Sequence, residues 1–370
     1  MSNVSNPLSP LPIYPRTTPR FHAMVKPTGA ICNLDCAYCY YLHKEELLGS
    51  NSKFRISDET LEAHIRQYIE AQCGDEVVFS WQGGEPTLLG VEFFEKVVAL
   101  EKKYQRPGMY IENDLQTNGT LLNDEWYSFL RQNKFLVGLS IDGPQELHDK
   151  FRVNKGGQPT FDKVFAAGQG LQKYGIPFNT LTVVNRVNAK KPLDVYRFLR
   201  RELRPCQLQF IPCVEPRTFT NTAPQKWDGA TLPTQDSPGA HPGHPDSVVT
   251  KWSVDPDDWG YFLCKVWDDW YRRDYGKVHV NLVRDRGRAV DGPGLAAMRI
   301  WRVLRQGRGS GARRQRLRLR SLRLSRIQAG QYCGNPHVAH GVFRGAEKVR
   351  FCQTRWPASA VPRMQVQVRL

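Results

Sequence analysis

Short apolar runs alternate with amphipathic stretches from Phe21 to about Val214. The apolar runs predict six strands, at Phe21–Val25, Val77–Trp81, Met109–Gln116, Leu136–Ile141, Phe178–Val184 and Gln207–Ile211. Apolar positions at helical spacing predict helices at Asp58–Gln72, Val91–Tyr104, Asp124–Gln132, Phe161–Tyr174 and Leu193–Arg201. Repeated strand–helix alternation indicates parallel strands joined by right-handed crossovers, so we expect an α/β fold, either a doubly wound sheet or a (β/α) barrel. Functional residues are then expected at the C-terminal strand ends.

Capping residues mark two of the predicted helix starts. Ser57 and Asn123 each precede helical apolar periodicity, with acidic residues in the first turn. Farther along the chain, residues 219–250 are rich in Thr, Pro, Gly, Asp, His and Gln and predict a long surface loop. The aromatic-rich stretch Asp255–Tyr275 has helical periodicity and predicts one more helix.

The charge of the 370-residue chain is concentrated at one end. There are 52 basic and 36 acidic residues in all, but residues 283–370 hold 20 of the basic and only 3 of the acidic ones. Residues 1–282 are therefore nearly neutral. We divide the chain into a flexible arm (1–20), a strand–helix domain (21–218), a loop with an aromatic-rich helix (219–282) and an Arg-rich tail (283–370).

Nine cysteines in a chain without an apolar secretory signal point to thiols or metal ligands and not to a disulfide framework. Cys32, Cys36 and Cys39 share one short loop after the first predicted strand. Three such thiolates can hold three irons of a 4Fe–4S cluster and leave the fourth iron open to a small molecule. Zinc is the alternative, although no fourth ligand stands at a usual spacing, and His43 is a weak candidate. The other cysteines of residues 1–282, at positions 73, 206, 213 and 264, are expected to be buried.

The cysteine loop, C-N-L-D-C-A-Y-C-Y-Y, resembles the cluster loop of radical S-adenosylmethionine (SAM) enzymes. Further motifs follow in order, at Trp81–Thr87 (WQGGEPT), Leu115–Thr120 (LQTNGT), Gly138–Pro144 (GLSIDGP), His148–Arg152 (HDxxR) and Gln209–Pro212 (QFIP). Together the motifs resemble anaerobic sulfatase-maturating enzymes over roughly residues 21–282. The resemblance implies a partial (β/α)6 radical SAM barrel, followed by an incomplete and disordered C-terminal region.

The resemblance also implies which residues form the site. Cys32, Cys36 and Cys39 would bind the 4Fe–4S cluster. The residues expected to bind SAM are Tyr38, Gly84, Ser140 and Arg152. Gln82 would face the peptide substrate. No catalytic residue is assigned, because the family's proposed base belongs to a segment that this sequence does not show.

The reaction implied is the oxidation of an active-site Cys or Ser of a sulfatase to Cα-formylglycine through a 5′-deoxyadenosyl radical. The implied partners are a sulfatase polypeptide and a reductase or flavodoxin-type electron donor, with no membrane and no specific nucleic acid. A cytoplasmic location is expected. The residues do not distinguish a Cys-type from a Ser-type target.

The Arg-rich tail suggests a change of reading frame. Arg316–Ile327 (RLRLRSLRLSRI) can be encoded so that the frame one base later reads V-Y-A-C-D-H-Y-V-Y-P-E-Y, like the family segment that carries the catalytic base. Three other stretches of the tail allow family-like peptides in the same shift. We therefore hypothesise a frameshift near Val283. The two auxiliary 4Fe–4S clusters of the family are then not expected in this chain, and maturation should be impaired.

Two other functions fit parts of the sequence. One is another peptide-modifying radical SAM enzyme of the same auxiliary-cluster superfamily. The motifs Gln82–Pro86 and Gln116–Thr120 favour the sulfatase maturase, and a neighbouring sulfatase gene would distinguish the two activities. A nucleic-acid-binding protein that uses residues 283–370 electrostatically is the alternative of a different class.

Overall fold

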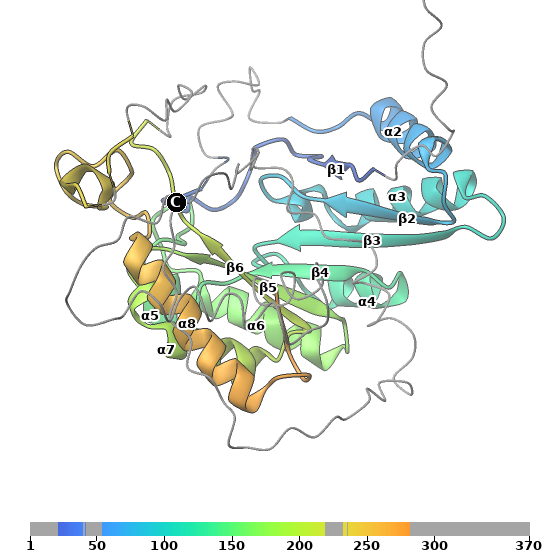
Figure 1. Cartoon of the computed structure of the whole chain (residues 1–370). Helices are drawn as coiled ribbons and strands as arrows, with labels where there is room; N and C mark the ends of the chain where they lie inside the picture. The colour runs from blue at the N-terminus through green and yellow to red at the C-terminus, as the bar shows by residue number, and fades with distance from the viewer. Residues whose placement is uncertain (1–20, 40, 42–53, 219–231, 235, 282–370) are drawn as a thin grey trace, which may run out of the picture.

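The computed structural model describes residues 21–39, 41, 54–218, 232–234 and 236–281 (Figure 1). In these residues one parallel sheet contains the strands β1 (Met24–Val25), β2 (Glu76–Trp81), β3 (Tyr110–Thr117), β4 (Leu136–Ser140), β5 (Phe178–Val184), β6 (Gln207–Pro212) and β7 (His279–Val280). The six predicted strands are confirmed. The additional strand β7 is only two residues long, which is too short to give a periodic signal in the sequence.

The strands pair in chain order from β1 to β7, and every pair is parallel. A doubly wound sheet reverses its strand order at a switch point, whereas unbroken sequential order is that of a (β/α) barrel. Within the described residues β1 and β7 are the two edges of the sheet. The fold is therefore a partial barrel, as the resemblance implied.

Helices connect the strands and cover the outside of the sheet (Figure 1). They are α2 (Asp58–Ala71), α3 (Val91–Tyr104), α4 (Asp124–Gln132), α5 (Gln145–His148), α6 (Phe161–Lys173), α7 (Pro192–Phe198) and α8 (Pro256–Arg273). Short turns of 3-10 helix lie at Pro86–Leu89, Asn188–Lys190 and Pro238–Ala240, and a π-helical turn follows α7 at Leu199–Leu203. All six predicted helices are confirmed, with ends shifted by a few residues.

The predicted caps explain where two helices begin. The Ser57 hydroxyl accepts a hydrogen bond from the backbone N–H of Thr60 at 3.2 Å, at the start of α2. The Asn123 side chain does the same for the N–H of Trp126 at 3.0 Å, at the start of α4. Each cap satisfies one of the N–H groups that a first helical turn leaves without a partner.

The main hydrophobic core lies between the sheet and its covering helices. Trp81 at the end of β2 is fully buried, and its ring centroid is 5.8 Å from that of Phe94 in α3. The Trp81 Nε1–H donates to Asn113 at 2.7 Å, and Asn113 Nδ2 donates to the Glu101 carboxyl at 2.9 Å. Burial raises the pKa of Glu101 to about 8, so this core acid is mostly protonated at neutral pH.

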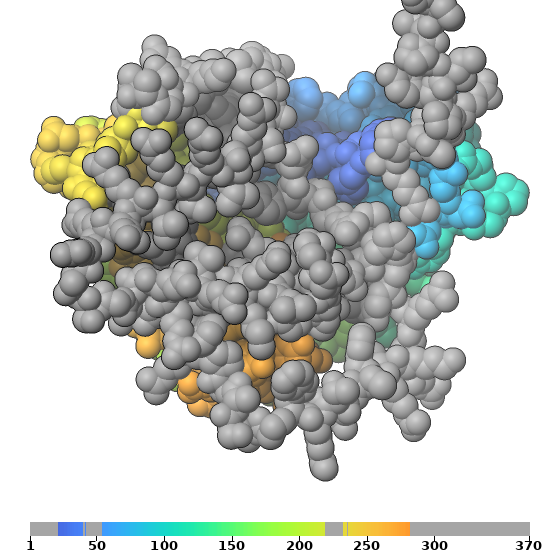
Figure 2. Space-filling model, viewed as in Figure 1, coloured from blue at the N-terminus to red at the C-terminus, as the bar shows by residue number. Residues whose placement is uncertain are grey.

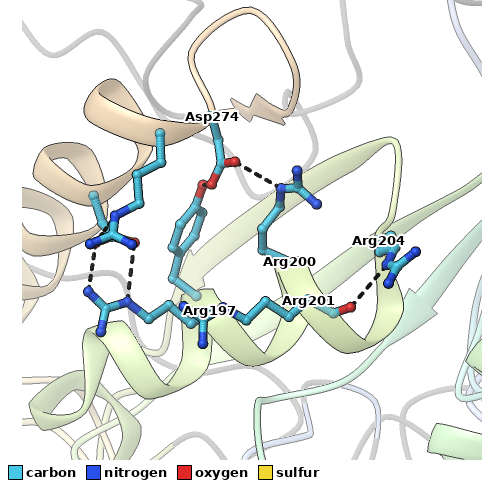
Figure 3. A pocket seen from close by; sticks show the side chains of 8 residues that line it. Arg197, Arg200, Arg201, Arg204 and Asp274 are labelled. Atoms are coloured by element: carbon cyan, nitrogen blue, oxygen red, sulfur yellow. Dashed lines mark hydrogen bonds and ion pairs between the residues drawn. The ribbon is translucent and has the colours of Figure 1, made fainter.

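The aromatic-rich helix α8 packs on α7 through paired charges (Figure 3). Arg197 Nη2 lies 2.8 Å from Asp269 Oδ1, and Arg200 Nε lies 3.1 Å from Asp274 Oδ1. The buried Tyr196 hydroxyl donates to Asp274 at 2.7 Å. These groups line a cavity of about 480 Å³. The two aspartates neutralise part of an arginine-rich surface, which lets α8 close over α7.

Several predictions fall outside the described residues. These are the flexible arm (1–20), the disordered tail and frameshift (283–370), and part of the 219–250 loop. The described part of that loop precedes α8 and lies on the outside of the molecule, where Figure 2 shows it in yellow. Among the described residues, no helix is both long enough and apolar enough to cross a membrane.

Candidate active site

The sequence motifs meet at the C-terminal ends of the parallel strands, as expected for a barrel. The cysteine loop follows β1, and it contacts the loops that follow β2, β3 and β4.

Backbone hydrogen bonds tie the cysteine loop to the segment after α5. The N–H of Asp35 donates to the carbonyl of Val153 at 2.8 Å, and the N–H of Ala37 donates to that of Phe151 at 3.0 Å. The first cysteine, Cys32, accepts at its sulfur from the N–H of Leu34 at 3.4 Å. Such N–H···S contacts are among the features that tune iron–sulfur centres.

The three cysteines differ from ordinary surface thiols. Cys36 is buried, and Cys32 and Cys39 are half-buried. Burial raises the pKa of Cys32 and of Cys36 to about 11 each, so both are neutral thiols at pH 7 unless a metal ion binds them. Coordination to a metal ion removes the proton outright. A buried loop of three thiols is thus chemically suited to a metal centre that supplies positive charge.

The number of cysteines on the loop fits a 4Fe–4S cluster with one open iron. Among the described residues, no three His, Cys, Asp or Glu side chains are placed to hold one metal ion. A structural zinc site needs four ligands on one atom. In a 4Fe–4S cluster the cysteine thiolates bind different iron atoms, so they need not converge on one point. Position 43, which was the weak alternative ligand, lies outside the described residues.

Gly84 is held against the backbone of the cysteine loop. A Cβ atom at this position would lie 1.9 Å from the carbonyl oxygen of Ile31, far inside contact distance. The N–H of Gly84 donates to the Gly29 carbonyl at 2.9 Å, and that of Glu85 donates to Ile31 at 2.8 Å. Close approach to the cysteine loop therefore requires glycine here, independently of any ligand.

Glu85 anchors the loop after β2 to the loop after β3. Its buried carboxylate accepts from the Thr87 hydroxyl at 2.6 Å, the Thr117 hydroxyl at 2.7 Å and the N–H of Asn118 at 2.7 Å. Burial raises the pKa of Glu85, although the hydrogen bonds work in the opposite direction. One carboxylate thus joins the loop after β2 to the loop after β3.

Asn118 continues this chain of contacts to the cysteines. Its side-chain N–H donates to Asn33 Oδ1 at 2.9 Å and lies 3.7 Å from the sulfur of Cys32. Asn33 in turn donates to the Thr120 hydroxyl at 2.9 Å. Loops after β2 and β3 therefore position the first cysteine through Glu85, Asn118 and Asn33.

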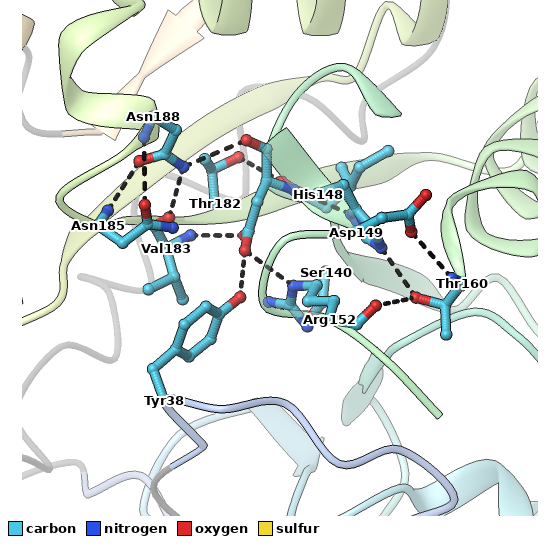
Figure 4. A network of polar contacts seen from close by, with 12 residues as sticks. Tyr38, Ser140, His148, Asp149, Arg152, Thr160, Thr182, Val183, Asn185 and Asn188 are labelled. Carbon is cyan, nitrogen blue, oxygen red and sulfur yellow. Dashed lines mark hydrogen bonds and ion pairs between the residues drawn. The ribbon is translucent and has the colours of Figure 1, made fainter. Parts of the chain in front are cut away.

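Asp142, just after β4, is the centre of a second network (Figure 4). Its fully buried carboxylate accepts a short hydrogen bond from the Tyr38 hydroxyl and another from the N–H of Val183 at 3.0 Å. Arg152 Nε lies 3.2 Å from the same carboxylate. Asn188 donates to the Asp142 carbonyl at 3.3 Å. One carboxylate thus joins the cysteine loop to β5 and to the segment after α5.

Arg152 brings a positive charge to the cysteine loop. The side chain is buried, and its guanidinium lies 5.6 Å from the Tyr38 ring centroid. Burial disfavours the charge and is the largest single effect, but Asp142, Tyr38 and Cys36 together outweigh it and raise the pKa of Arg152. The same cation lowers the pKa of the Cys36 thiol and so offsets part of the increase that burial causes. Arg152 is therefore a fixed cation beside Cys36 and Tyr38.

His148 and Thr160 hold the backbone of Arg152 by hydrogen bonds (Figure 4). The Thr160 hydroxyl donates to the Arg152 carbonyl at 2.8 Å and lies 3.1 Å from His148 Nε2. Burial lowers the pKa of His148 well below its usual value, so the imidazole is neutral. Asp149 accepts from the N–H groups of Thr160 and Phe161 at 2.9 Å each and caps α6. His148 and Asp149 of the HDxxR motif thus hold Thr160, and Thr160 holds the backbone of Arg152.

Ser140 and Gln82 complete the set of predicted site residues. Ser140 ends β4, and its hydroxyl accepts from Gln116 Nε2 at 3.0 Å. Gln82 follows β2, with its N–H bonded to the Val25 carbonyl at 2.8 Å and its side chain half-buried. Both residues lie at the strand ends that carry the other motifs.

Sequence reasoning was wrong about two other cysteines. Cys213 and Cys264 are buried as predicted, but Cys73 and Cys206 are exposed. Both exposed cysteines lie in connections, one after α2 and one before β6.

The central role of Asp142 was also missed. The position of Asp142, directly after a strand and before Gly143 and Pro144, could have indicated a buried carboxylate. Such a carboxylate needs a cationic partner. The sequence alone did not show that Arg152 and Tyr38 come from different segments to meet it.

The comparisons agree with this geometry. The model of the radical SAM superfamily matches residues 27–199. A serine-type anaerobic sulfatase-maturating enzyme of Bacteroides thetaiotaomicron is 44% identical over 261 residues, which cover 70% of this chain and 60% of that protein. A cysteine-type enzyme of Clostridium perfringens is 35% identical over 253 residues, covering 68% and 61%.

A solved structure is similar as well. Native anSMEcpe with bound AdoMet and the Cp18Cys peptide is 34% identical with a TM-score of 0.57, over 72% of this chain and 64% of that one. The chain thus spans about 60% of the length of the curated relatives it matches. Sequence motifs, fold and comparisons lead to one conclusion, that this chain carries a radical SAM domain over residues 27–199.

Proposed function

We propose that this chain is a radical SAM oxidoreductase that converts a Cys or Ser of a sulfatase polypeptide to Cα-formylglycine. The observation that carries the proposal is the buried three-cysteine loop, held at the strand ends by the Glu85–Asn118 and Asp142–Arg152 contacts. The named relatives include both serine-type and cysteine-type enzymes. Both targets therefore belong in the test.

In this proposal Cys32, Cys36 and Cys39 would hold a 4Fe–4S cluster, and the iron without a cysteine ligand would be available to SAM. When bound, the cluster and SAM supply an electron and a 5′-deoxyadenosyl radical, which removes a hydrogen atom from the Cβ of the target residue. Transfer of a further electron to a one-electron acceptor, and of a proton to water, would leave an aldehyde from Ser or a thioaldehyde from Cys. Water would hydrolyse the thioaldehyde to the aldehyde with release of hydrogen sulfide.

The remaining site residues bind and orient SAM and the peptide. Arg152, kept protonated by Asp142, pairs with the SAM carboxylate. Tyr38, Ser140 and the backbone at Gly84 contact SAM, and Gln82 faces the peptide. Tyr38 and Arg152 are buried, which would help to keep water from a reactive intermediate. The partners proposed are a sulfatase polypeptide and a one-electron donor.

The test begins with anaerobic reconstitution of the full chain with iron and sulfide. We expect visible charge-transfer absorption and, after dithionite reduction, cleavage of SAM to methionine and 5′-deoxyadenosine, measured by liquid chromatography with mass spectrometry. A Cys36→Ser variant should lose both signals. The exposed Cys73 supplies the matched control, because Cys73→Ser should keep both.

Sulfatase peptides that carry Cys or Ser at the target position then test the second half of the reaction. Formation of an aldehyde on either peptide supports the maturase function and identifies the target type. Absorption that survives in Cys36→Ser, or a reconstituted chain that leaves SAM intact, would refute the proposal. SAM cleavage without aldehyde formation would agree with the impairment expected from the sequence of residues 283–370.

A further inference from the structure

A cavity of about 590 Å³ lies beside the cysteine loop. Five cationic side chains line it, those of Lys150, Arg186, Lys190, Lys191 and Lys251, and none of its lining residues is acidic. The cations come from three separate segments, which follow α5, β5 and the 232–250 stretch. We call this feature the cationic groove.

The charges of the groove are available to a partner. All five cationic residues are exposed. Lys190 lies 3.7 Å from Asp258 and Lys191 lies 3.8 Å from Glu146, and exposed pairs at such distances are weak. No ion pair within the described residues engages Lys150 or Lys251. The groove therefore keeps a strong positive potential.

Two aromatic residues of the groove, Phe151 and Trp252, also pack against the cysteine loop. Phe151 lines the groove, its carbonyl accepts from the N–H of Ala37, and its ring centroid lies 6.0 Å from that of Tyr38. Trp252 also lines the groove and packs on the cluster of buried side chains that contains Cys36 and Tyr38. The two aromatic residues that line the groove thus pack directly on the buried cluster that contains Cys36.

We propose that the cationic groove is the docking surface for an acidic one-electron carrier protein of the flavodoxin type. This inference rests on the proposed function, since only a cluster on Cys32, Cys36 and Cys39 gives such a carrier something to reduce. The reduced carrier loses one electron, the cluster gains that electron, and no atom is transferred. Clustered cations steer an acidic partner to the surface, and aromatic side chains such as the half-buried Phe151 and Trp252 are enriched at the centres of protein interfaces.

Charge reversal tests the proposal. The double variant Lys150→Glu/Lys251→Glu changes two exposed side chains that are not part of the cysteine site. Rapid mixing of an acidic flavodoxin hydroquinone with the reconstituted full chain measures the rate of electron transfer. At low ionic strength we expect the variant to be slower by about tenfold or more, with the difference shrinking as salt is added.

A matched reversal provides the control. Lys102 and Lys173 lie in the last turns of α3 and α6, at the opposite end of the barrel from the cysteine loop. Lys102→Glu/Lys173→Glu has the same net charge change and should be reduced by flavodoxin at nearly the parent rate. Both double variants should be reduced by dithionite at the parent rate, because a small reductant needs no docking surface.

Binding to the cluster-free full chain separates this proposal from the proposed function. Titration with oxidised flavodoxin should show binding that only the groove reversal weakens, by about tenfold. Equal flavodoxin rates for parent and groove variant, or equal losses in the two variants, would overturn the docking site. If the groove instead binds single-stranded DNA and flavodoxin reduction is unchanged, the proposal also fails. A chain that dithionite reduces but that leaves SAM intact would count against the proposed function alone.

Discussion

Replacement of Asp142 by asparagine should strongly destabilise the domain. The carboxylate is fully buried and faces the buried Arg152 cation at 3.2 Å. Asparagine keeps the size of the side chain but removes the negative charge, and its amide N–H groups would face the guanidinium and the Tyr38 hydroxyl. Breaking one side of a buried ion pair typically costs about 3–5 kcal/mol, because the remaining charge is uncompensated. We expect a loss of this size in the free energy of unfolding.

A double-mutant cycle separates the charge effect from packing. Arg152→Gln alone leaves the carboxylate of Asp142 without its cation and should also destabilise. In the double variant Asp142→Asn/Arg152→Gln neither charge remains, so the loss should be smaller than the sum of the two single losses. Urea unfolding followed by circular dichroism gives all four free energies. Additive losses, or an Asp142→Asn variant within about 0.5 kcal/mol of the parent, would refute the buried-pair reasoning.

Three further predictions concern positions outside this pair. Gly84→Ala places a Cβ 1.9 Å from the Ile31 carbonyl oxygen, so the cysteine loop must shift. Iron–sulfur loading, measured by absorption, should fall while the secondary structure is retained. Normal loading would contradict the contact. Glu101 has a folded-state pKa of about 8 against an ordinary value of 4.5, so the parent should lose stability as pH rises between these values, by about 1.4 kcal/mol per pH unit. Glu101→Gln should flatten that slope in urea unfolding from pH 5 to 8, and identical slopes would exclude the buried acid as its cause. Tyr196→Phe removes the hydrogen bond to Asp274 and should cost about 1.5–3 kcal/mol, measured by the same unfolding assay; an unchanged urea midpoint would show that the bond adds nothing.

The sequence by itself determined the fold class, most element boundaries and the cysteine loop. Strand periodicity in Phe178–Val184 and helical periodicity in Val91–Tyr104 are local signals, and both elements have these bounds in the structure. The spacing of Cys32, Cys36 and Cys39 is local too. Local patterns suffice here because side-chain direction repeats every two residues in a strand and about every 3.6 in a helix.

Only the tertiary structure decided what each motif does. The need for Gly84 comes from a backbone carbonyl 53 positions earlier in the chain, at Ile31. The ion pair of Asp142 with Arg152, the burial of Glu101 and the cationic groove each join segments that are separate in sequence. Burial and Coulomb interaction depend on distance in space, so no local pattern could give the pKa of Glu101 or the partner of Arg152. The sequence thus identified the cysteine loop and its motifs, and the packing of the strand ends against that loop determined which residues hold it in place.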